Sequence, residues 1–442
     1  MRRLVHMLVL VLAGEMIFGL PFHTARFFRP TLLDAFGFSN TQLGDVFAVY
    51  GVTAMLAYFP GGALADRFPA RKLMGLSLLA TAAGGLYMAT FPGFPQMAVL
   101  YGYWGVTTIF LFWAAMIRMA RDWGGSTSQG LAFGVLDGGR GLAAAGFALL
   151  AVSALAMYLP LDSLGSDNLE RRQGLRSVIL LYSAATAACG VLAWFLLPDA
   201  DSGSALRPER RAPPNRGPEP RSRSTMLRNM GPVLRSMWVV LRQPLVWAQA
   251  AVIVCAYCAY KGLDNYSLYA VQVLGLGEVE AARLTAWASW LRPLAAVLTG
   301  LAADRFRAGR AIAVAFAVLA LSFAALSLAE PSGGWLKVIY ANVFVSFFAV
   351  FALRGVYFAL LEETGTPRHL TGTTVGAVSL IGYTPEIFFG PVSGRILDRS
   401  PGPEGHQDYF LFLAGCAVLG LLAAAWLVRA HGRQRRPPPS AR

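Results

Sequence analysis

The sequence is poor in charged residues. Only 14% of its 442 residues are Asp, Glu, Lys or Arg, whereas an average soluble domain has about 25%. Cys255 and Cys258 have the spacing of a metal or redox motif, but no second Cys or His pair accompanies them. The chain also lacks the Gly-x-x-x-x-Gly-Lys-Ser/Thr loop of nucleotide-driven pumps. These absences argue against a soluble domain, a metal or other cofactor, an ATP-driven pump and an enzyme.

Long apolar segments make up most of the chain instead. Apolar residues account for 56% of the sequence, and a helix needs roughly 20 of them to cross a membrane. Twelve windows meet this requirement: 4–26, 41–65, 73–91, 95–119, 128–157, 175–197, 240–273, 281–303, 309–329, 335–361, 370–397 and 407–429. The sequence therefore predicts an all-α membrane protein with twelve transmembrane helices.

Basic residues are concentrated in alternate connections between these windows. The formal net charge is +14, and most Lys and Arg residues fall on one side of the membrane if there are twelve crossings. The bias of basic residues toward the cytoplasm explains this pattern, so nucleic acid is not expected as a partner. We expect a multi-pass monomer in the inner membrane, surrounded by lipid, with both termini in the cytoplasm.

One segment divides the windows into six and six. Residues 198–237 are rich in proline and arginine, which is typical of a solvated linker that builds no core. We therefore expect a six-helix bundle at 1–197, a basic cytoplasmic linker at 198–237, a second bundle at 238–430 and a disordered basic tail at 431–442.

The two halves share a short repeat. Gly-Gly-Ala-Leu-Ala-Asp-Arg-Phe follows the second window at 61–68, and Thr-Gly-Leu-Ala-Ala-Asp-Arg-Phe follows the eighth at 299–306. This pattern resembles the loop signature of the major facilitator superfamily, although Pro69 stands where the family usually has Gly. The resemblance covers nearly the whole chain. It implies two pseudo-symmetric six-helix bundles that work by alternating access.

The resemblance also implies a gate at the cytoplasmic helix ends. Glycines let membrane helices approach closely, the aspartate interacts with a helix N-terminus, and the arginines pair with carboxylates. These contacts would hold one conformation and break in the other. The expected gating residues are Gly62, Asp66, Arg67, Arg71, Gly300, Asp304, Arg305 and Arg310.

Charged residues inside the windows are functional candidates, because a charge at the bilayer centre costs about 2.5–3.5 kcal/mol on insertion scales. When the two copies of the repeat are superimposed, His23 maps onto Lys261 and Arg26 maps onto Asp264. Lys261 and Asp264 are three residues apart, so they share a helix face. Both halves thus place an ionisable group at the same height.

Asp137 and Arg140 have the same three-residue spacing, which allows either a self-neutralising pair or part of a proton path. Arg354 has no acidic residue within one turn, and Glu386 is its most natural partner in the protein. The residues expected to act in proton coupling or as charge pairs are Asp137, Arg140, Asp264 and Glu386.

Basic groups outnumber the acidic Glu15, Asp137, Asp264 and Glu386 among these candidates, which favours a substrate with an anionic group. Arginine binds carboxylate, phosphate or sulfonate through two parallel hydrogen bonds. The expected substrate-binding residues are His23, Arg26, Lys261, Arg292, Arg354, Trp113 and Tyr260. The pattern is similar to the organophosphate and organic-anion branch of the superfamily, in which paired bases on helices 1 and 7 hold the anion. His23 and Lys261 occupy the matching positions.

The leading interpretation is a secondary transporter for a small organic anion, either proton-coupled or an exchanger. The substrate would be a carboxylate, a sugar acid or a phosphorylated or sulfonated metabolite. One alternative is a multidrug or lipophile efflux pump, which predicts an aromatic cavity with one acidic group; the excess of buried arginine argues against it. A second alternative is a membrane sensor that does not transport, and only the retained charges argue against that.

Overall fold

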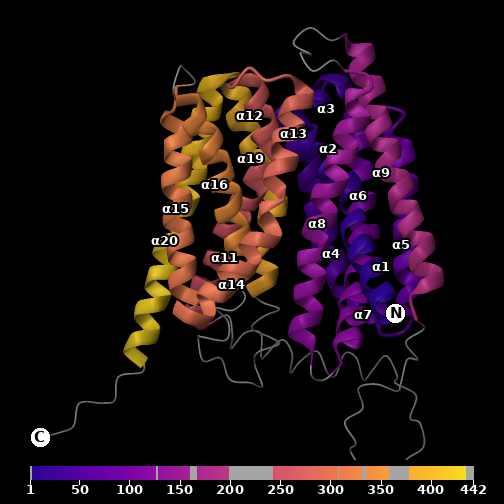
Figure 1. The fold of residues 1–442 in the computed structure, drawn as a ribbon, viewed down its shortest axis with the longest axis horizontal. Helices are drawn as coiled ribbons and strands as arrows, with labels where there is room; N and C mark the ends of the chain where they lie inside the picture. Colours follow the sequence, from indigo (N-terminus) through magenta and orange to yellow (C-terminus); the bar gives the residue numbers. More distant parts are fainter. Residues whose placement is uncertain are drawn as a thin grey trace, which may run out of the picture.

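The computed structural model describes residues 2–125, 128–159, 167–198, 242–306, 308–330, 335–357 and 378–434. The regular structure in these ranges is helical, and Figure 1 shows two groups of long helices side by side. Residues 199–237 of the predicted linker and 435–442 of the predicted tail lie outside the described residues.

The first group contains six membrane crossings, and we call it the N-terminal half. Its helices are α1 (Arg2–Met16), η1 (Gly19–His23), α2 (Thr24–Phe27) and α3 (Arg29–Phe36) in the first crossing, then α4 (Asn40–Ala65), α5 (Ala70–Met88), α6 (Phe94–Gly105) with η2 (Val106–Trp113) and α7 (Ala114–Gly124), α8 (Gln129–Ala156) and α9 (Asn168–Leu196).

The second group contains the other six crossings and is called the C-terminal half. Its helices are α11 (Pro244–Gly262) with η3 (Leu263–Asn265) and α12 (Tyr266–Gln272), α13 (Glu278–Ser289) with α14 (Leu291–Phe306), α15 (Ala308–Leu328), α16 (Trp335–Val356), α19 (Pro385–Arg399) and α20 (Pro403–Gln434). The last of these, α20, continues into the segment that was predicted as a disordered tail.

Within the described part of the chain, seven helices are long and apolar enough to cross a membrane, and the bent pair of α1 and η1–α2 makes an eighth. Some of the other crossings do not form one helix of the required length in the described residues, for local reasons. The eighth crossing is interrupted at Trp290, and the residues directly before 378 in the eleventh lie outside the described ranges. The arrangement is the predicted all-α fold of twelve crossings in two six-helix bundles.

The first crossing differs from its predicted window, which ended at residue 26. It continues through α3 to Phe36 and bends by 41° between α1 and the following segment. Pro21 explains the bend, because proline lacks a backbone N–H and disrupts the hydrogen-bond ladder; a π-helical segment forms there. The window was too short because Arg26 and Arg29 resemble a membrane boundary, whereas both are buried.

The two ends of the molecule differ. The start of α1 and the end of α20 lie at the lower edge of Figure 1, which we call the terminal end. The opposite edge, where α3, α12 and α13 lie, is called the far end.

The halves pack tightly toward the far end through α4 and α19. A Cβ atom on Gly44 would overlap the backbone carbonyl of Gly390, so only glycine allows this approach. Asp398 of α19 accepts hydrogen bonds from the backbone N–H groups of Asn40 (3.1 Å) and Thr41 (2.7 Å). It thereby caps the first turn of α4 from the other half. The far end is closed in this conformation.

Candidate functional site

A cavity of about 130 Å³ lies between the two halves. Its walls come from the first, second, fourth and fifth crossings of the N-terminal half and from the matching crossings of the C-terminal half, with one wall residue on α14. All the substrate-binding residues predicted from the sequence line it: His23, Arg26, Trp113, Tyr260, Lys261, Arg292 and Arg354. Arg140 and Glu386 also line it.

Irregular backbone positions the ionisable groups of the first and seventh crossings. His23 ends the π-helical segment η1, and Arg26 follows in the short helix α2. Lys261 and Asp264 flank the point where α11 gives way to the 3-10 segment η3. Broken helices at matching heights are a recurring way for transporters to build a central site.

Glu15 is the centre of the first group of charges, the Glu15 cluster. Its carboxylate lies 3.2 Å from His23 Nε2, 3.0 Å from Arg140 Nε and 3.5 Å from Arg292 Nη1. Arg292 also contacts Asp137 Oδ1 at 2.8 Å. The carboxylates of Glu15 and Asp137 balance the formal charges of Arg140 and Arg292 in this cluster.

A second group, the Asp264 cluster, contains Arg26, Lys261, Asp264 and Glu386. Asp264 lies 2.6 Å from Arg26 Nε and 3.0 Å from Lys261 Nζ. Lys261 Nζ is also 3.4 Å from Glu386, whose other oxygen accepts a hydrogen bond from Tyr257. Two acids and two bases again balance. The Arg26–Asp264 contact joins the two residues that the internal repeat superimposes, so it lies on the pseudo-symmetry axis.

Arg354 of α16 belongs to neither cluster. Its guanidinium carbon lies 3.8 Å from the ring centroid of Tyr260, and that of Arg26 lies 4.4 Å from the same ring. Among the described residues, no carboxylate lies within ion-pair distance of Arg354, the only cavity base of which this is true. The positive charge left over in the cavity is therefore located at Arg354.

Two pairings that the sequence left open are not formed in this conformation. Asp137 and Arg140 do not pair with each other, because each finds a closer partner on another helix, Arg292 and Glu15 respectively. Glu386 does not pair with Arg354, because α11 places Lys261 beside it. Helical spacing identifies residues that share one face of a helix, but it does not show which side chains of the neighbouring helix lie opposite them.

Sequence reasoning counts Glu15 among the acids inside the apolar windows but assigns it no role, and it does not single out Tyr257. Glu15 is the acid of the first apolar window, and it gathers three basic side chains from three helices. The sequence indicates its importance, because a buried carboxylate without a basic neighbour on its own helix must find a partner on another helix. Tyr257 is one of several tyrosines around the cavity, and nothing in the sequence distinguishes it.

The predicted gating motifs lie at the terminal end. Asp66 and Arg67 are exposed, and among the described residues neither has a side-chain hydrogen bond or ion pair. A Cβ atom on Gly62 or Gly300 would meet nothing within 4 Å. The close helix approach expected at these glycines is thus absent here. Of the other motif residues, Arg305 and Arg310 are exposed, Arg71 is half-buried with its guanidinium engaged, and the Asp304 side chain is outside the described set.

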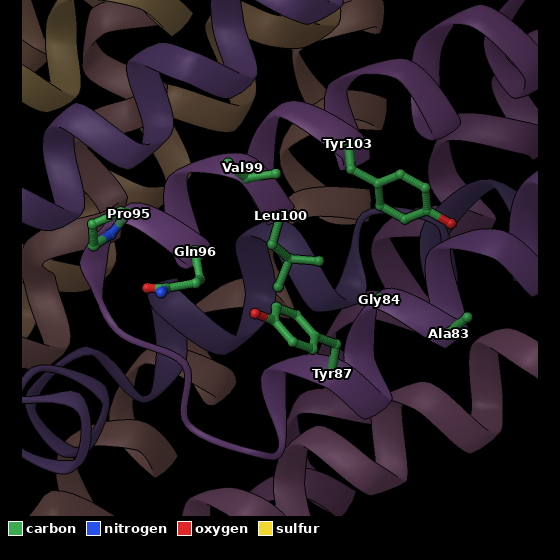
Figure 2. Close-up of a pocket in the computed structure, with 8 residues that line it drawn as sticks. All are labelled: Ala83, Gly84, Tyr87, Pro95, Gln96, Val99, Leu100 and Tyr103. Carbon is green, nitrogen blue, oxygen red and sulfur yellow. The ribbon is translucent and has the colours of Figure 1, made fainter.

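A groove of about 570 Å³ lies away from these charges, between α5 and α6 (Figure 2). Its walls are Ala83, Gly84, Tyr87, Pro95, Gln96, Val99, Leu100 and Tyr103. It has no charged side chain, and Tyr87, Val99 and Tyr103 are exposed in a region expected to face lipid. The cavity between the halves is therefore the candidate site.

Comparison with known sequences assigns the chain to a family. The Major Facilitator Superfamily model matches residues 11–385. The inner membrane protein YqcE of Escherichia coli (strain K12) is 26% identical over 426 residues, which cover 95% of this chain and 93% of YqcE. The inner membrane protein YihN of the same strain is 26% identical over 436 residues, covering 97% and 96%. The probable nitrate/nitrite antiporter NarK1 of Thermus thermophilus is 27% identical over 303 residues, covering 67% and 60%.

Solved structures share the fold. A mutant of the nucleoside transporter NupG superimposes with a TM-score of 0.73 at 12% identity, covering 97% of this chain and 100% of that chain. A bacterial homologue of the human lysosomal transporter Spinster, in an inward-facing and unoccupied conformation, gives a TM-score of 0.67 at 15% identity, covering 99% and 98%. These likenesses establish the architecture alone.

Proposed function

Because this chain belongs to the Major Facilitator Superfamily, we propose that it is a secondary transporter that moves a small organic anion by alternating access. Family membership, and not any missing residue, is also the reason to regard it as a transporter and not an enzyme. The chemistry of the cargo is argued from the cavity.

The single observation that carries the anion assignment is the position of Arg354. The Glu15 and Asp264 clusters are each neutral, so a ligand carboxylate gains nothing from displacing their internal partners. The Arg354 guanidinium lies against the ring face of Tyr260 and, among the described residues, has no carboxylate partner. An anion there would receive charge-assisted hydrogen bonds in a partly desolvated site, where such bonds are strong. One surplus charge favours a monoanion over a dianion.

The rest of the wall favours a small cargo with polar and apolar parts. Tyr50, Tyr58, Tyr257 and Tyr383 line the cavity, and Trp113 packs edge-on against Phe18. Such walls suit a carboxylate, a sugar acid or a sulfonated metabolite, and they extend the similarity to the organic-anion branch. The relative NarK1 is a probable nitrate/nitrite antiporter, which supports an anionic cargo. A lipophile efflux pump fits less well, because five Arg and Lys residues line the wall.

Glu386 is the carboxylate that we propose for proton coupling. Asp264 contacts two bases and Asp137 contacts Arg292 at 2.8 Å, so both are held as anions. Glu386 has a lysine at 3.4 Å and a tyrosine hydroxyl. Its ion pairing is therefore the weakest of the three carboxylates, and an exchanger would use the same site without proton coupling.

The conformation fits an inward-facing state. The far end is closed by contacts between the halves, whereas Asp66 and Arg67 at the terminal end are exposed. We propose that the terminal end is cytoplasmic, as the distribution of basic residues predicts, and that the two gating motifs close in the opposite state. We further propose that the protein works as a monomer in the inner membrane, with residues 198–237 as a cytoplasmic linker between the halves.

A thermal-shift screen of purified protein tests the proposal. The probes are nitrate, acetate, gluconate, glucuronate, a sugar sulfonate and a sugar phosphate, with glucose as the uncharged reference. We expect a monoanion to stabilise the wild type and Arg283→Ala, which removes an exposed arginine on α13 outside the cavity, but not Arg354→Ala. Equal stabilisation of wild type and Arg354→Ala would overturn the assignment.

A further inference from the structure

Arg29 is a second arginine whose charge is not balanced by an ion pair. Its side chain is buried, with 2% of its surface exposed. Its hydrogen bond is from Nε to Asn40 Oδ1 at 3.2 Å, and among the described residues it has no ion pair. Asp264 and Asp398 influence it electrostatically, but each is engaged with other partners. A buried charge without a counterion is unfavourable, so its retention calls for a reason.

The place of Arg29 in the fold suggests that reason. Arg26, one turn earlier, forms the ion pair with Asp264 at the cavity wall. Asn40, the partner of Arg29, is held by Asp398 at the closed far end, through both its backbone N–H and its side-chain amide. Arg29 therefore lies between the cavity and the far end, behind the contacts that close this end.

Opening the far end would uncover Arg29. Asp398 belongs to the C-terminal half, whereas Arg29 and Asn40 belong to the N-terminal half. When the halves separate there, Asn40 loses Asp398, and Arg29 stays behind with a neutral amide as its contact. Solvent and solutes that enter from the far end then reach this guanidinium before they reach the cavity.

We propose that Arg29 is an anion-capture residue of the outward-open state, which attracts the anionic cargo toward the cavity. The inference rests on the proposed transport of an anion but concerns a different residue and the opposite state. The charge that is unfavourable while the far end is closed becomes useful once water and an anion reach it.

A pair of thiol reagents of opposite charge tests this without a known substrate. Thr31→Cys places a thiol two residues from Arg29, at a position that is 1% exposed and faces Glu278 of the other half. The rates for an anionic and a cationic methanethiosulfonate are measured on purified protein in a neutral detergent. Both reagents need the same opening of the far end, so the ratio of their rates reports local charge and not the frequency of opening. Reaction of the four native cysteines, of which Cys416 is only partly buried, is measured in the chain that lacks Thr31→Cys.

We expect Arg29→Gln to lower the anionic-to-cationic ratio by about three- to ten-fold, as for a unit charge roughly 7 Å away in partly screened water. Glutamine keeps a donor for Asn40, so loss of the hydrogen bond is not the cause. Arg29→Lys should keep the high ratio, and Arg283→Gln, on the exposed face of α13, should not change it.

An unchanged ratio in Arg29→Gln would overturn the inference, and so would a thiol at position 31 that reacts with neither reagent. Failure of the anion-transport proposal gives a different result. In that case the ratio still depends on Arg29, but no probe in the thermal-shift screen distinguishes Arg354→Ala from wild type.

Discussion

The Glu15 cluster and the Arg354 region lie on the same cavity but accommodate buried charge in different ways. Glu15 is surrounded by His23, Arg140 and Arg292, and the cluster is neutral. Arg354 instead faces Tyr260 and retains its charge. The difference indicates a division of labour, because paired charges hold helices together whereas an unpaired charge is available to a ligand. The predictions below test this division.

The largest effect is expected from Glu15→Gln. This change leaves Arg140 and Arg292 beside a neutral amide in a buried site, and removal of one partner from a buried pair costs about 3–5 kcal/mol. We expect a clear fall in the melting temperature of the purified protein. Glu404→Gln, which changes an exposed carboxylate on α20, serves as the control.

Adding Arg140→Gln to Glu15→Gln restores neutrality and should recover part of the lost stability. If the double variant is as unstable as the two single losses combined, the pairing account of the Glu15 cluster fails.

Arg354→Ala is expected to reduce transport while leaving the stability of the protein nearly unchanged. Loss of charge-assisted hydrogen bonds to the cargo corresponds to roughly 3 kcal/mol, or about 100-fold in uptake, with little change in melting temperature. Arg354→Lys keeps the positive charge but loses the planar guanidinium that forms two parallel hydrogen bonds. Its uptake rate should lie between those of the wild type and Arg354→Ala. Uptake is measured in proteoliposomes at matched protein amounts, and unchanged uptake in Arg354→Ala would remove the basis of the comparison.

Sequence reasoning identified the scaffold and the ionisable residues of the cavity but not how they pair. The fold could be predicted from the apolar windows and from the repeated Gly and Asp-Arg pattern. Membrane thickness fixes the length of each helix, and the internal repeat fixes the division into two halves. Lys261 and Asp264 do contact each other, since three-residue spacing holds within one helix. Arg140–Glu15 and Arg292–Asp137 were not foreseen, because helix rotation and the π-helical break at Pro21 decide which faces meet.

An effect of intermediate size is expected from a change at the far end. Glu278 accepts hydrogen bonds from Arg171 Nε at 2.6 Å and from Thr31 of the opposite half. Glu278→Gln weakens this contact by roughly 1–2 kcal/mol and should raise the open population of the far end by about five- to thirty-fold. The rate at which a neutral maleimide labels Thr31→Cys, with and without Glu278→Gln, measures the shift. An equal rate would show that this ion pair does not hold the far end closed.

The smallest effect is expected from a single methyl group on Gly62 at the terminal end, and Gly44 at the far end provides the contrasting site. A Cβ atom on Gly62 meets nothing within 4 Å in this conformation, whereas one on Gly44 overlaps the carbonyl of Gly390. Gly62→Ala should therefore leave the melting temperature unchanged or slightly raised, since alanine favours helix by up to about 1 kcal/mol. It should nevertheless slow uptake a few-fold, because in the proposed mechanism the terminal end closes over this glycine in the other state. Gly44→Ala should instead lower stability and increase labelling at the far end. Identical behaviour of the two variants would mean that the ends do not alternate, and that the closed far end is a fixed feature of the fold.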